Sequence, residues 1–164
     1  MKRIFDFLVS FIGLLLLLPI LLIVTVMIKV SSKGDVFYKQ VRVGKNNIDF
    51  KLYKFRTMRL NSDKLGLITV GSKDARITAL GYYLRKYKLD ELPQLFNVLL
   101  GNMSFVGPRP EVRKYVNLYK QDQMQVLKVR PGITDLASIE FRNESELLSK
   151  QENPDNYYIN VIMP

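Results

Sequence analysis

The sequence predicts an α+β fold that is mostly helical, with a proline-kinked re-entrant membrane helix at its N-terminus, a small β-hairpin and several amphipathic helices. The first observation is that residues 11–28 contain no charged side chain. The second is that two segments of alternating polarity follow, joined by a short polar turn. The third is that most later apolar residues recur at helical spacing. A chain of 164 residues suits a membrane segment, expected over residues 1–29, and one domain with a modest core, expected over residues 30–164.

The apolar segment is predicted to enter one leaflet of a bilayer and return. As a helix it would span roughly 27 Å at about 1.5 Å per residue, which is marginal for a hydrocarbon core of about 30 Å. Pro19 lies in its middle, where a proline removes a backbone hydrogen bond and kinks the helix. We expect Arg3 to pair with Asp6 at the surface, and a simple spanning anchor is the alternative. The positive-inside rule favours the cytoplasm for both ends, because basic residues flank each of them: Lys2, Arg3, Lys29, Lys33, Lys39 and Arg42.

Residues 36–43 and 48–55 are predicted to form the β-hairpin. Both segments alternate in polarity, with Ile48, Phe50 and Leu52 on one face of the second, and "GKNN" supplies the turn between them. Residues 60–75 are polar and contain glycine, so we expect a mobile loop there.

Helical patterns follow the loop. A helix begins at Asp90 or Glu91 and ends at Gly101, a regular C-terminal stop. We expect an extended piece and a rigid turn in "MSFVGPRPE", a helix containing Tyr115 and Tyr119, a break before "RPGIT" and a capped helix in "NESELLSKQEN". The chain stops at "VIMP" without a closing element, so a truncated C-terminus is expected. An amphipathic helix is also predicted over residues 77–88, between the loop and the helix that begins at Asp90 or Glu91. Its apolar face is expected to pack on the core or, as the alternative, on a bilayer, and it consists of Ile77, Leu80, Leu84 and Tyr87.

Composition limits the chemistry. The chain has 25 Lys and Arg against 15 Asp and Glu, a net charge of +10, which indicates an anionic partner. It has neither Cys nor His, which excludes zinc sites built on those ligands, thiol nucleophiles and Ser-His or Cys-His mechanisms. The absence of Cys also excludes disulfides, in keeping with a cytosolic face. Any nucleophilic or acid–base chemistry must use carboxylates, Lys, Tyr or hydroxyls.

The adjacent acids Asp90 and Glu91 have two interpretations. Asp90 can cap a helix that carries Pro93 in its first turn. Alternatively, the N–H groups at a helix start bind a phosphate together with Arg85 and Arg109, the latter in "GPRP". One carboxylate there can attack phosphorus while the other holds Mg²⁺. The residues alone leave both interpretations open.

Longer motifs add a resemblance. "KRIFDF" opens the chain, "FYKQVRVGKNN" and "YKFRTMR" cover the hairpin, and "DARIT", "LRKYKLDELPQLFNVLLGNMSFVGPRPE" and "RPGIT" follow in order. In order and spacing these motifs resemble the monotopic polyprenyl-phosphate phosphoglycosyl transferases of bacteria, the bacterial sugar transferase family. The resemblance covers essentially the whole chain and is most specific in the long central run.

The resemblance implies transfer of a phospho-sugar from a UDP-sugar to undecaprenyl phosphate with release of UMP, the first membrane step of glycoconjugate biosynthesis. It implies that residues 30–164 are a catalytic domain on the cytoplasmic face of the bacterial inner membrane, held by a monotopic anchor. The partners implied are UDP-sugar, undecaprenyl phosphate and membrane lipid, with no nucleic acid. The sugar, the glycoconjugate pathway and the oligomeric state are not specified by the sequence.

By resemblance, Asp90 matches the nucleophile that forms a covalent phospho-sugar intermediate, and Glu91 matches the neighbouring acid of the pair. Both are associated with Mg²⁺, the implied cofactor. Arg85 and Arg109 match residues that contact the phosphates, and Arg142 in "FRNE" matches an arginine near the nucleotide end. The basic residues of "YKFRTM", which lie around the site or on a solvated strand face, are Lys54 and Arg56.

The sequence departs from the family pattern at two places. Leu18-Pro19 stands where members commonly have Ser-Pro, and the proline alone suffices for a kink. "GITDLASIEFRN" carries Asp135 and Phe141 where glycines often stand, which bears on the sugar that fits. The alternatives to an active transferase are a truncated or inactive family member and a non-enzymatic, membrane-tethered module that binds anions. Such a module would gather its basic residues in one tract, whereas here they are spread along the chain.

Overall fold

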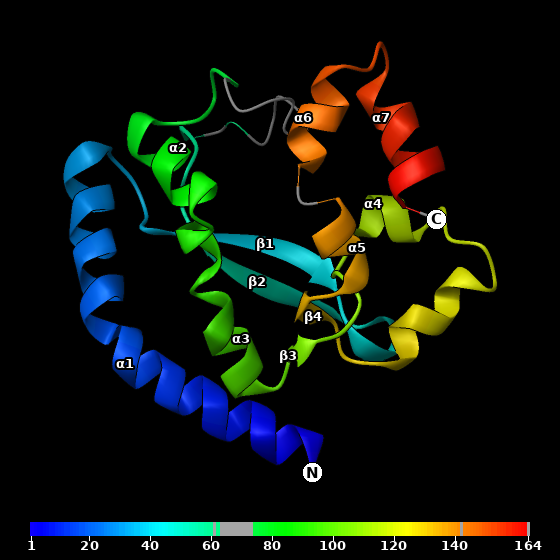
Figure 1. Cartoon of the computed structure of the whole chain (residues 1–164), viewed down its shortest axis with the longest axis horizontal. Helices are drawn as coiled ribbons and strands as arrows, with labels where there is room; N and C mark the ends of the chain where they lie inside the picture. Colours follow the sequence, from blue (N-terminus) through cyan, green and yellow to red (C-terminus); the bar gives the residue numbers. More distant parts are fainter. Residues whose placement is uncertain (61, 63–73, 142, 164) are drawn as a thin grey trace.

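The structure, a computed structural model, describes residues 1–60, 62, 74–141 and 143–163. These residues form an α+β fold with one long N-terminal helix and two small sheets (Figure 1). Most of the expected loop over residues 60–75 lies outside the described residues. The helices are α1 (Lys2–Ser31), α2 (Ala79–Lys86), α3 (Gln94–Leu100), α4 (Arg113–Val116), α5 (Leu136–Glu140), α6 (Glu144–Ser149) and α7 (Pro154–Tyr157). The strands are β1 (Phe37–Val43), β2 (Asp49–Phe55), β3 (Ser104–Val106) and β4 (Gly132–Thr134).

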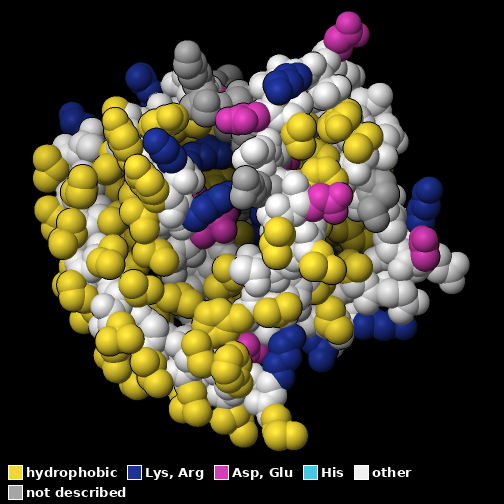
Figure 2. Space-filling model, viewed as in Figure 1, with side chains coloured by type: hydrophobic (Ala, Val, Ile, Leu, Met, Phe, Trp, Pro, Cys, Tyr) yellow, Lys and Arg dark blue, Asp and Glu magenta, His cyan; other side chains and the backbone are white. Residues whose placement is uncertain are grey.

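Helix α1 is continuous through Pro19 and is long and apolar enough to cross a membrane by length and composition. Its axis curves around α3 and toward α2 (Figure 1). Only 22% of its most apolar window is buried, and Figure 2 shows apolar side chains covering this side of the molecule. The face that packs on the domain recurs at helical spacing and consists of Asp6, Ser10, Leu14, Leu21, Val24 and Ile28.

The N-terminal end of α1 is tied to the far end of α3. The Arg3 guanidinium donates to the carbonyls of Val98 and Leu99, while Asp6 Oδ1 accepts a hydrogen bond from the Phe105 N–H at 3.3 Å. The expected pairing of Arg3 with Asp6 is therefore wrong. The last carbonyls of a helix have no intrahelical donors and carry partial negative charge, so they attract a cation from another element.

Strands β1 and β2 form the predicted antiparallel hairpin, with Phe37 opposite Phe55 and Val43 opposite Asp49. The turn passes through a 3₁₀ segment, Lys45–Asn47, whose last two residues, Asn46 and Asn47, have φ of 58° and 63°. Asparagine tolerates this left-handed conformation better than most residues.

Strand β2 begins at Asp49, one residue later than the expected start at Ile48. Leu52 is buried, whereas Ile48, which follows the left-handed residues of the turn, is 67% exposed.

Helix α2 confirms the helix predicted over 77–88 with shorter bounds. It begins after Thr78, whose hydroxyl accepts from the Gly81 N–H at 2.9 Å. Leu84 is buried, but Tyr87 lies beyond the last helical residue and is 61% exposed, so its predicted place on the core face is wrong. Gly81 is required by close packing, because a Cβ there would lie 2.0 Å from the Thr57 carbonyl oxygen.

Strands β3 and β4 form a second, parallel sheet that the sequence patterns did not predict. Ser104 pairs with Gly132 and Val106 with Thr134. The backbones approach so closely that a Cβ on Gly132 would lie 2.2 Å from the Gly107 nitrogen. This contact places the "GPRP" turn directly against "RPGIT".

The C-terminal elements are short. Helix α4 ends at Val116, so Tyr119 lies outside the helix expected to contain it. Helix α6 forms as predicted, but Asn143 makes no side-chain cap; α6 ends at Ser149, and Pro154 opens α7. A second apolar cluster joins this region to α4 and consists of Val112, Tyr115, Leu148 and Tyr158.

Candidate functional site

The adjacent acids lie in a 3₁₀ turn, Leu89–Glu91, that follows Lys88 in the left-handed conformation, φ 56°. Helix α3 begins only at Gln94, after Pro93, and ends at Gly101 as predicted. Asp90 therefore caps no helix, and the capping interpretation of this pair is wrong. Pro93 is the N-cap of α3, and the residues before it form a separate turn from which Glu91 contacts Lys54 of β2.

Glu91 is paired with Lys54 of β2. The Lys54 ammonium donates to Glu91 Oε1 at 2.8 Å, and both side chains are about four-fifths buried. Burial by itself would raise the pKa of Glu91, but the charge and hydrogen bond of Lys54 outweigh it and lower that pKa to about 2. Burial lowers the pKa of the Lys54 ammonium, and Glu91 opposes this. Glu91 is therefore a carboxylate at neutral pH.

Asp90 has a different environment. It is 7% exposed, and within the described residues its Oδ1 atom has no hydrogen-bond partner. Burial raises the pKa of Asp90, whereas the charges of Lys54 and Arg85 lower it in part. A buried carboxylate oxygen without a donor is costly unless a ligand, ion or proton meets it. Asp90 is thus the group in this turn that is poised to contact something from outside the chain.

The side-chain amide of Asn97 fixes the distance between α3 and β2. Asn97 is fully buried on α3; its Nδ2 donates to the Lys51 carbonyl at 2.8 Å and its Oδ1 accepts from the Tyr53 N–H at 2.9 Å. These bonds replace a strand partner along the free edge of β2. They hold Lys54 within reach of Glu91.

Arg109 completes the charged surface. It lies in the turn after β3 and lines an open hollow of about 290 Å³ together with Lys54, Glu91, Arg42 and Gln94. Within the described residues no hydrogen bond or ion pair occupies its guanidinium, which is exposed. Figure 2 shows basic and acidic side chains gathered in a hollow beside α2 and α3. A cationic hollow with free donors is suited to phosphate groups.

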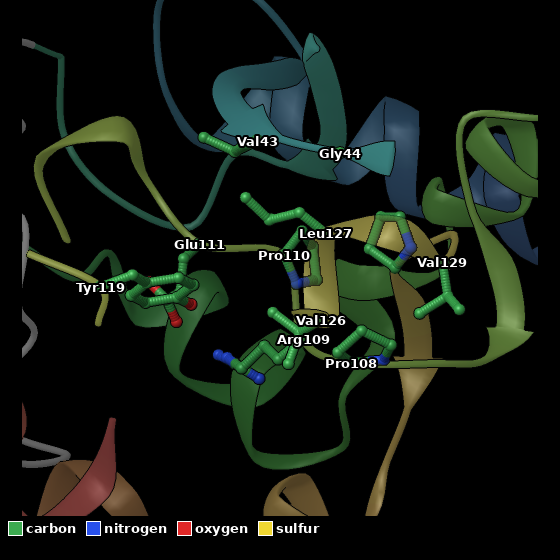
Figure 3. A pocket seen from close by; sticks show the side chains of 11 residues that line it. Val43, Gly44, Pro108, Arg109, Pro110, Glu111, Tyr119, Val126, Leu127 and Val129 are labelled. Carbon is green, nitrogen blue, oxygen red and sulfur yellow. The ribbon is translucent and has the colours of Figure 1, made fainter. Parts of the chain in front are cut away.

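A second hollow of about 240 Å³ lies on the other side of the same turn (Figure 3). Arg109 lines it too, near Glu111 and Tyr119, and the opposite wall is apolar, with Pro108 and Val129. The Arg109 guanidinium therefore borders both hollows.

The remaining predicted site residues occupy different places. Arg85, in the last turn of α2, contributes to the field at Asp90, and burial lowers its own pKa. Arg56 is buried, and its guanidinium donates to the carbonyls of Ser32 (2.9 Å) and Lys33 (2.6 Å), the residues that follow α1. Arg142 lies outside the described residues. The structure thus brings together Asp90, Glu91, Arg85, Arg109 and Lys54 and directs Arg56 to the end of α1.

Arg42 is the residue of this hollow that the sequence analysis considered only as a flank of the apolar segment. The sequence held a weak indication of this role, because Arg42 lies on the same face of the hairpin as Lys54, which was already a candidate site residue. Its contact with the turn after β3 is between residues distant in sequence, which no local pattern reveals.

Asp90 and Glu91 are the residues to consider as ligands of a divalent cation. No group of three or more acidic side chains that suits a metal occurs in the described part of the chain. Glu91 lines the hollow and Asp90 precedes it in the chain; Asp90 Oδ1 lacks a partner within the described residues, while Glu91 Oε1 is held by Lys54. Mg²⁺ commonly takes one or two carboxylates and completes its shell with water and substrate phosphates. The pair fits Mg²⁺ in that manner, together with phosphate oxygens.

The fold and the site define a basic protein with a long apolar helix and a buried carboxylate, Asp90, next in the chain to an acid that lines a cationic hollow. The chain belongs to the bacterial sugar transferase family, whose family model matches residues 1–163. It is 42% identical over 160 residues to a UDP-glucose:undecaprenyl-phosphate glucose-1-phosphate transferase of Klebsiella pneumoniae, covering 95% of this chain and 34% of that protein.

Two further relatives agree with this assignment. A UDP-N-acetylgalactosamine-undecaprenyl-phosphate N-acetylgalactosaminephosphotransferase of Aeromonas hydrophila is 44% identical over 141 residues, which cover 84% of this chain and 33% of that protein. The exopolysaccharide production protein ExoY of Rhizobium meliloti (strain 1021) is 41% identical over 158 residues, which cover 87% of this chain and 70% of that protein. The chain thus spans about a third of the first two relatives.

Proposed function

We propose that this protein transfers a sugar 1-phosphate from a UDP-sugar to undecaprenyl phosphate and releases UMP. The observation that carries the proposal is Asp90, a buried carboxylate with an unpartnered oxygen in the field of Lys54 and Arg85. Family membership and the names of the relatives support the substrate class. The cationic hollow supports a diphosphate substrate, because charge-assisted donors bind phosphate strongly.

The chemistry divides into two displacements at one phosphorus atom. An Asp90 carboxylate oxygen attacks the phosphorus that bears the sugar, the bond from this phosphorus to the bridging oxygen breaks, and UMP leaves with that oxygen and the bonding electrons. A phosphate oxygen of undecaprenyl phosphate then attacks the same phosphorus. The bond to Asp90 breaks, which restores the carboxylate and yields the polyprenyl diphosphosugar. No proton must be transferred in either displacement, which suits a chain without His or Cys.

Each neighbour has a part in this scheme. Lys54 holds Glu91 ionised and lowers the pKa of Asp90, and so favours the nucleophilic form. Arg109 and Arg85 bind the phosphates. Asp90 and Glu91 would hold Mg²⁺, which would neutralise charge on the diphosphate. Arg142 is proposed to lie near the nucleotide.

The membrane arrangement follows from the same substrates. We propose that α1 enters one leaflet, bends at Pro19 and returns, so that the protein is monotopic on the cytoplasmic face of the bacterial inner membrane. The apolar outer face of α1 and the basic residues at both ends support this, because the headgroup of undecaprenyl phosphate lies at the bilayer surface. Arg56, bonded to the end of α1, then links the anchor to β2.

UMP release tests the proposal. Detergent-solubilised protein is incubated with a panel of UDP-sugars, undecaprenyl phosphate and Mg²⁺, and the rates of wild type, Asp90→Asn and Asp122→Asn are compared. We expect release by wild type and by Asp122→Asn, which alters an exposed acid outside the hollow, and a loss of about a thousandfold or more for Asp90→Asn, as is usual for a nucleophile. Equal release by Asp90→Asn would remove Asp90 from its role.

A second measurement isolates the covalent step. Without undecaprenyl phosphate, wild type should release up to one equivalent of UMP and gain the mass of a sugar phosphate, and Asp90→Asn should do neither. Release of UMP without a mass gain would contradict the two-displacement scheme. Absence of release with every sugar, with tight nucleotide binding retained, would favour the non-enzymatic anion-binding module.

A further inference from the structure

Arg42 is held on three sides by groups of the protein itself. Its Nε and Nη2 donate to Gln40 Oε1 at 3.0 and 2.8 Å, and its Nη1 donates to the Pro110 carbonyl at 2.8 Å. A guanidinium has five N–H donors in a rigid fork. With these donors engaged and its side chain 15% exposed, Arg42 is fixed in orientation although it lines the anion-binding hollow.

Glu111 closes the arrangement from the other side. Its Oε2 lies 3.6 Å from Arg42 Nη1, and its Oε1 accepts a hydrogen bond of 2.6 Å from the Tyr158 hydroxyl. Glu111 is 8% exposed, so its charge depends on these partners. Burial, together with Glu111, raises the pKa of Tyr158, which therefore remains a donor at physiological pH. The backbone carbonyl of Glu111 also accepts from the Val43 N–H at 2.8 Å.

The residue between these contacts is Arg109. Pro108 and Pro110 restrict its neighbours, and the Pro108 carbonyl accepts from the Gly132 N–H at 3.0 Å. Arg42 and Glu111 thus hold the turn on the side of Pro110, while β4 holds it on the side of Pro108. The Arg109 side chain, by contrast, makes no hydrogen bond or ion pair within the described residues, although the charges of Glu144 and Glu91 act on it, and Arg109 borders both hollows.

We infer that Arg42 is a positioning residue for substrate binding: it fixes the turn that carries Arg109, and the buried Glu111–Tyr158 pair fixes Arg42. The C-terminal segment that contributes Tyr158 is then part of the binding site through a chain of contacts, although it touches neither hollow. This inference rests on the proposed function for the identity of the ligand, a nucleoside diphosphate bound at Arg109. The contacts that hold the turn around Arg109 do not depend on the identity of the ligand.

The variants that test the inference are Arg42→Lys, Arg42→Gln, Tyr158→Phe and the double variant Arg42→Lys/Tyr158→Phe. Lys keeps the charge of Arg42 but lacks the fork that bonds Gln40 and Pro110 together, and Phe removes only the hydroxyl. Arg113→Lys is the matched control, because Arg113 bonds Asn47 and Asp49 on the same hairpin and lines neither hollow. Thermal unfolding verifies that each full-length variant is folded in detergent.

Two readouts are compared. The first is amide hydrogen exchange over residues 107–112, which we expect to become about tenfold faster in Arg42→Lys and less so in Tyr158→Phe, with Arg113→Lys unchanged. The second is affinity for UDP in the presence of Mg²⁺. We expect a loss of about tenfold for Arg42→Lys and about threefold for Tyr158→Phe, and the double variant should be no weaker than Arg42→Lys, because both act through the same turn.

Unchanged exchange over residues 107–112 in Arg42→Lys would overturn the inference, and so would faster exchange with wild-type affinity for UDP. Wild-type affinity in Arg42→Lys combined with a large loss in Arg42→Gln would overturn it in favour of a direct charge contact with phosphate. Failure of the proposed function is recognised separately, as absence of UMP release by wild type. In that case the exchange comparison still decides the role of Arg42.

Discussion

Asp90 and Glu91 are adjacent in the chain, and their pKa values are shifted in opposite directions. Burial raises the pKa of Asp90, whereas the ion pair with Lys54 overcomes burial and lowers that of Glu91 to about 2. Two carboxylates whose environments separate their pKa values take separate roles. Lys54 acts on both, directly on Glu91 and through its charge on Asp90.

Replacing Lys54 should shift the pH dependence of the reaction. Lys54 lowers the pKa of Asp90, so Lys54→Met should raise it and move the acid limb of kcat/KM to higher pH. At neutral pH we expect a loss of roughly 10–100-fold, since a charge-assisted interaction contributes about 1.5–3 kcal/mol. The measurement is the pH profile of UMP release. Lys51→Met, which alters an exposed side chain of the same strand, should keep the wild-type profile, and an acid limb that stays in place in Lys54→Met would contradict the assignment.

Glu91 should make folding stability depend on pH in acid. Its folded pKa of about 2 lies below its unfolded value of 4.5, so its contribution is fully present above about pH 4.5 and is lost as the pH falls toward 2. Because burial destabilises the Lys54 charge, the net contribution of the pair is roughly 1–3 kcal/mol. Urea unfolding of detergent-solubilised protein between pH 3 and 6 should show a shallower pH dependence in Glu91→Gln than in wild type.

The double variant Lys54→Met/Glu91→Gln serves as the control for this pair. Removing one partner leaves a buried charge without compensation, so Lys54→Met should be less stable than the double variant. Equal pH slopes in wild type and Glu91→Gln would show that folding does not lower the pKa of Glu91.

The contact of Arg3 with the end of α3 should stabilise the docking of α1. Arg3→Gln removes a cation from the Val98 and Leu99 carbonyls, and we expect it to lower the free energy of unfolding by about 1–2 kcal/mol. Lys2→Gln is the control, because Lys2 makes an exposed bond to the Val106 carbonyl and its loss should cost about 0.5 kcal/mol or less. Thermal unfolding followed by circular dichroism in detergent measures both. Equal effects would mean that the α3 carbonyls are satisfied without Arg3.

The proposed bend at Pro19 can be tested by labelling, because the chain contains no cysteine. Single cysteines at the exposed positions Ile4 and Ser31 should both react with an impermeant maleimide from the cytoplasmic side of membrane vesicles. In Pro19→Ala we expect part of the population to expose Ile4→Cys on the opposite side, since the restored backbone hydrogen bond favours a straight helix. Labelling of Ile4→Cys and Ser31→Cys from opposite sides with Pro19 present would establish a simple spanning anchor instead.

Local sequence patterns predicted much of the fold. The hairpin over 36–55 follows from alternation and a turn rich in asparagine, and the end of α3 at Gly101 follows from the left-handed conformation, φ 88°, that glycine adopts readily. The same patterns misplaced Asp90 as a cap, because they could not show that Pro93 delays the start of α3 to Gln94. They also missed the β3–β4 pairing, since strands of three residues carry almost no periodicity.

The sequence by itself determined the apolar helix, the excess of positive charge and the pair of acids beside a proline, because each depends on residues close together in the chain. Only the tertiary structure decided what those acids meet. Lys54 and Glu91 are 37 residues apart, Arg42 and Pro110 are 68 apart, and Glu111 and Tyr158 are 47 apart. Their energies depend on burial and on distances of a few ångströms, which arise when α3 packs on β2 and the turn after β3 packs on β4. Which carboxylate pairs with Lys54, and which arginine makes no hydrogen bond or ion pair within the described residues, follow from that packing alone.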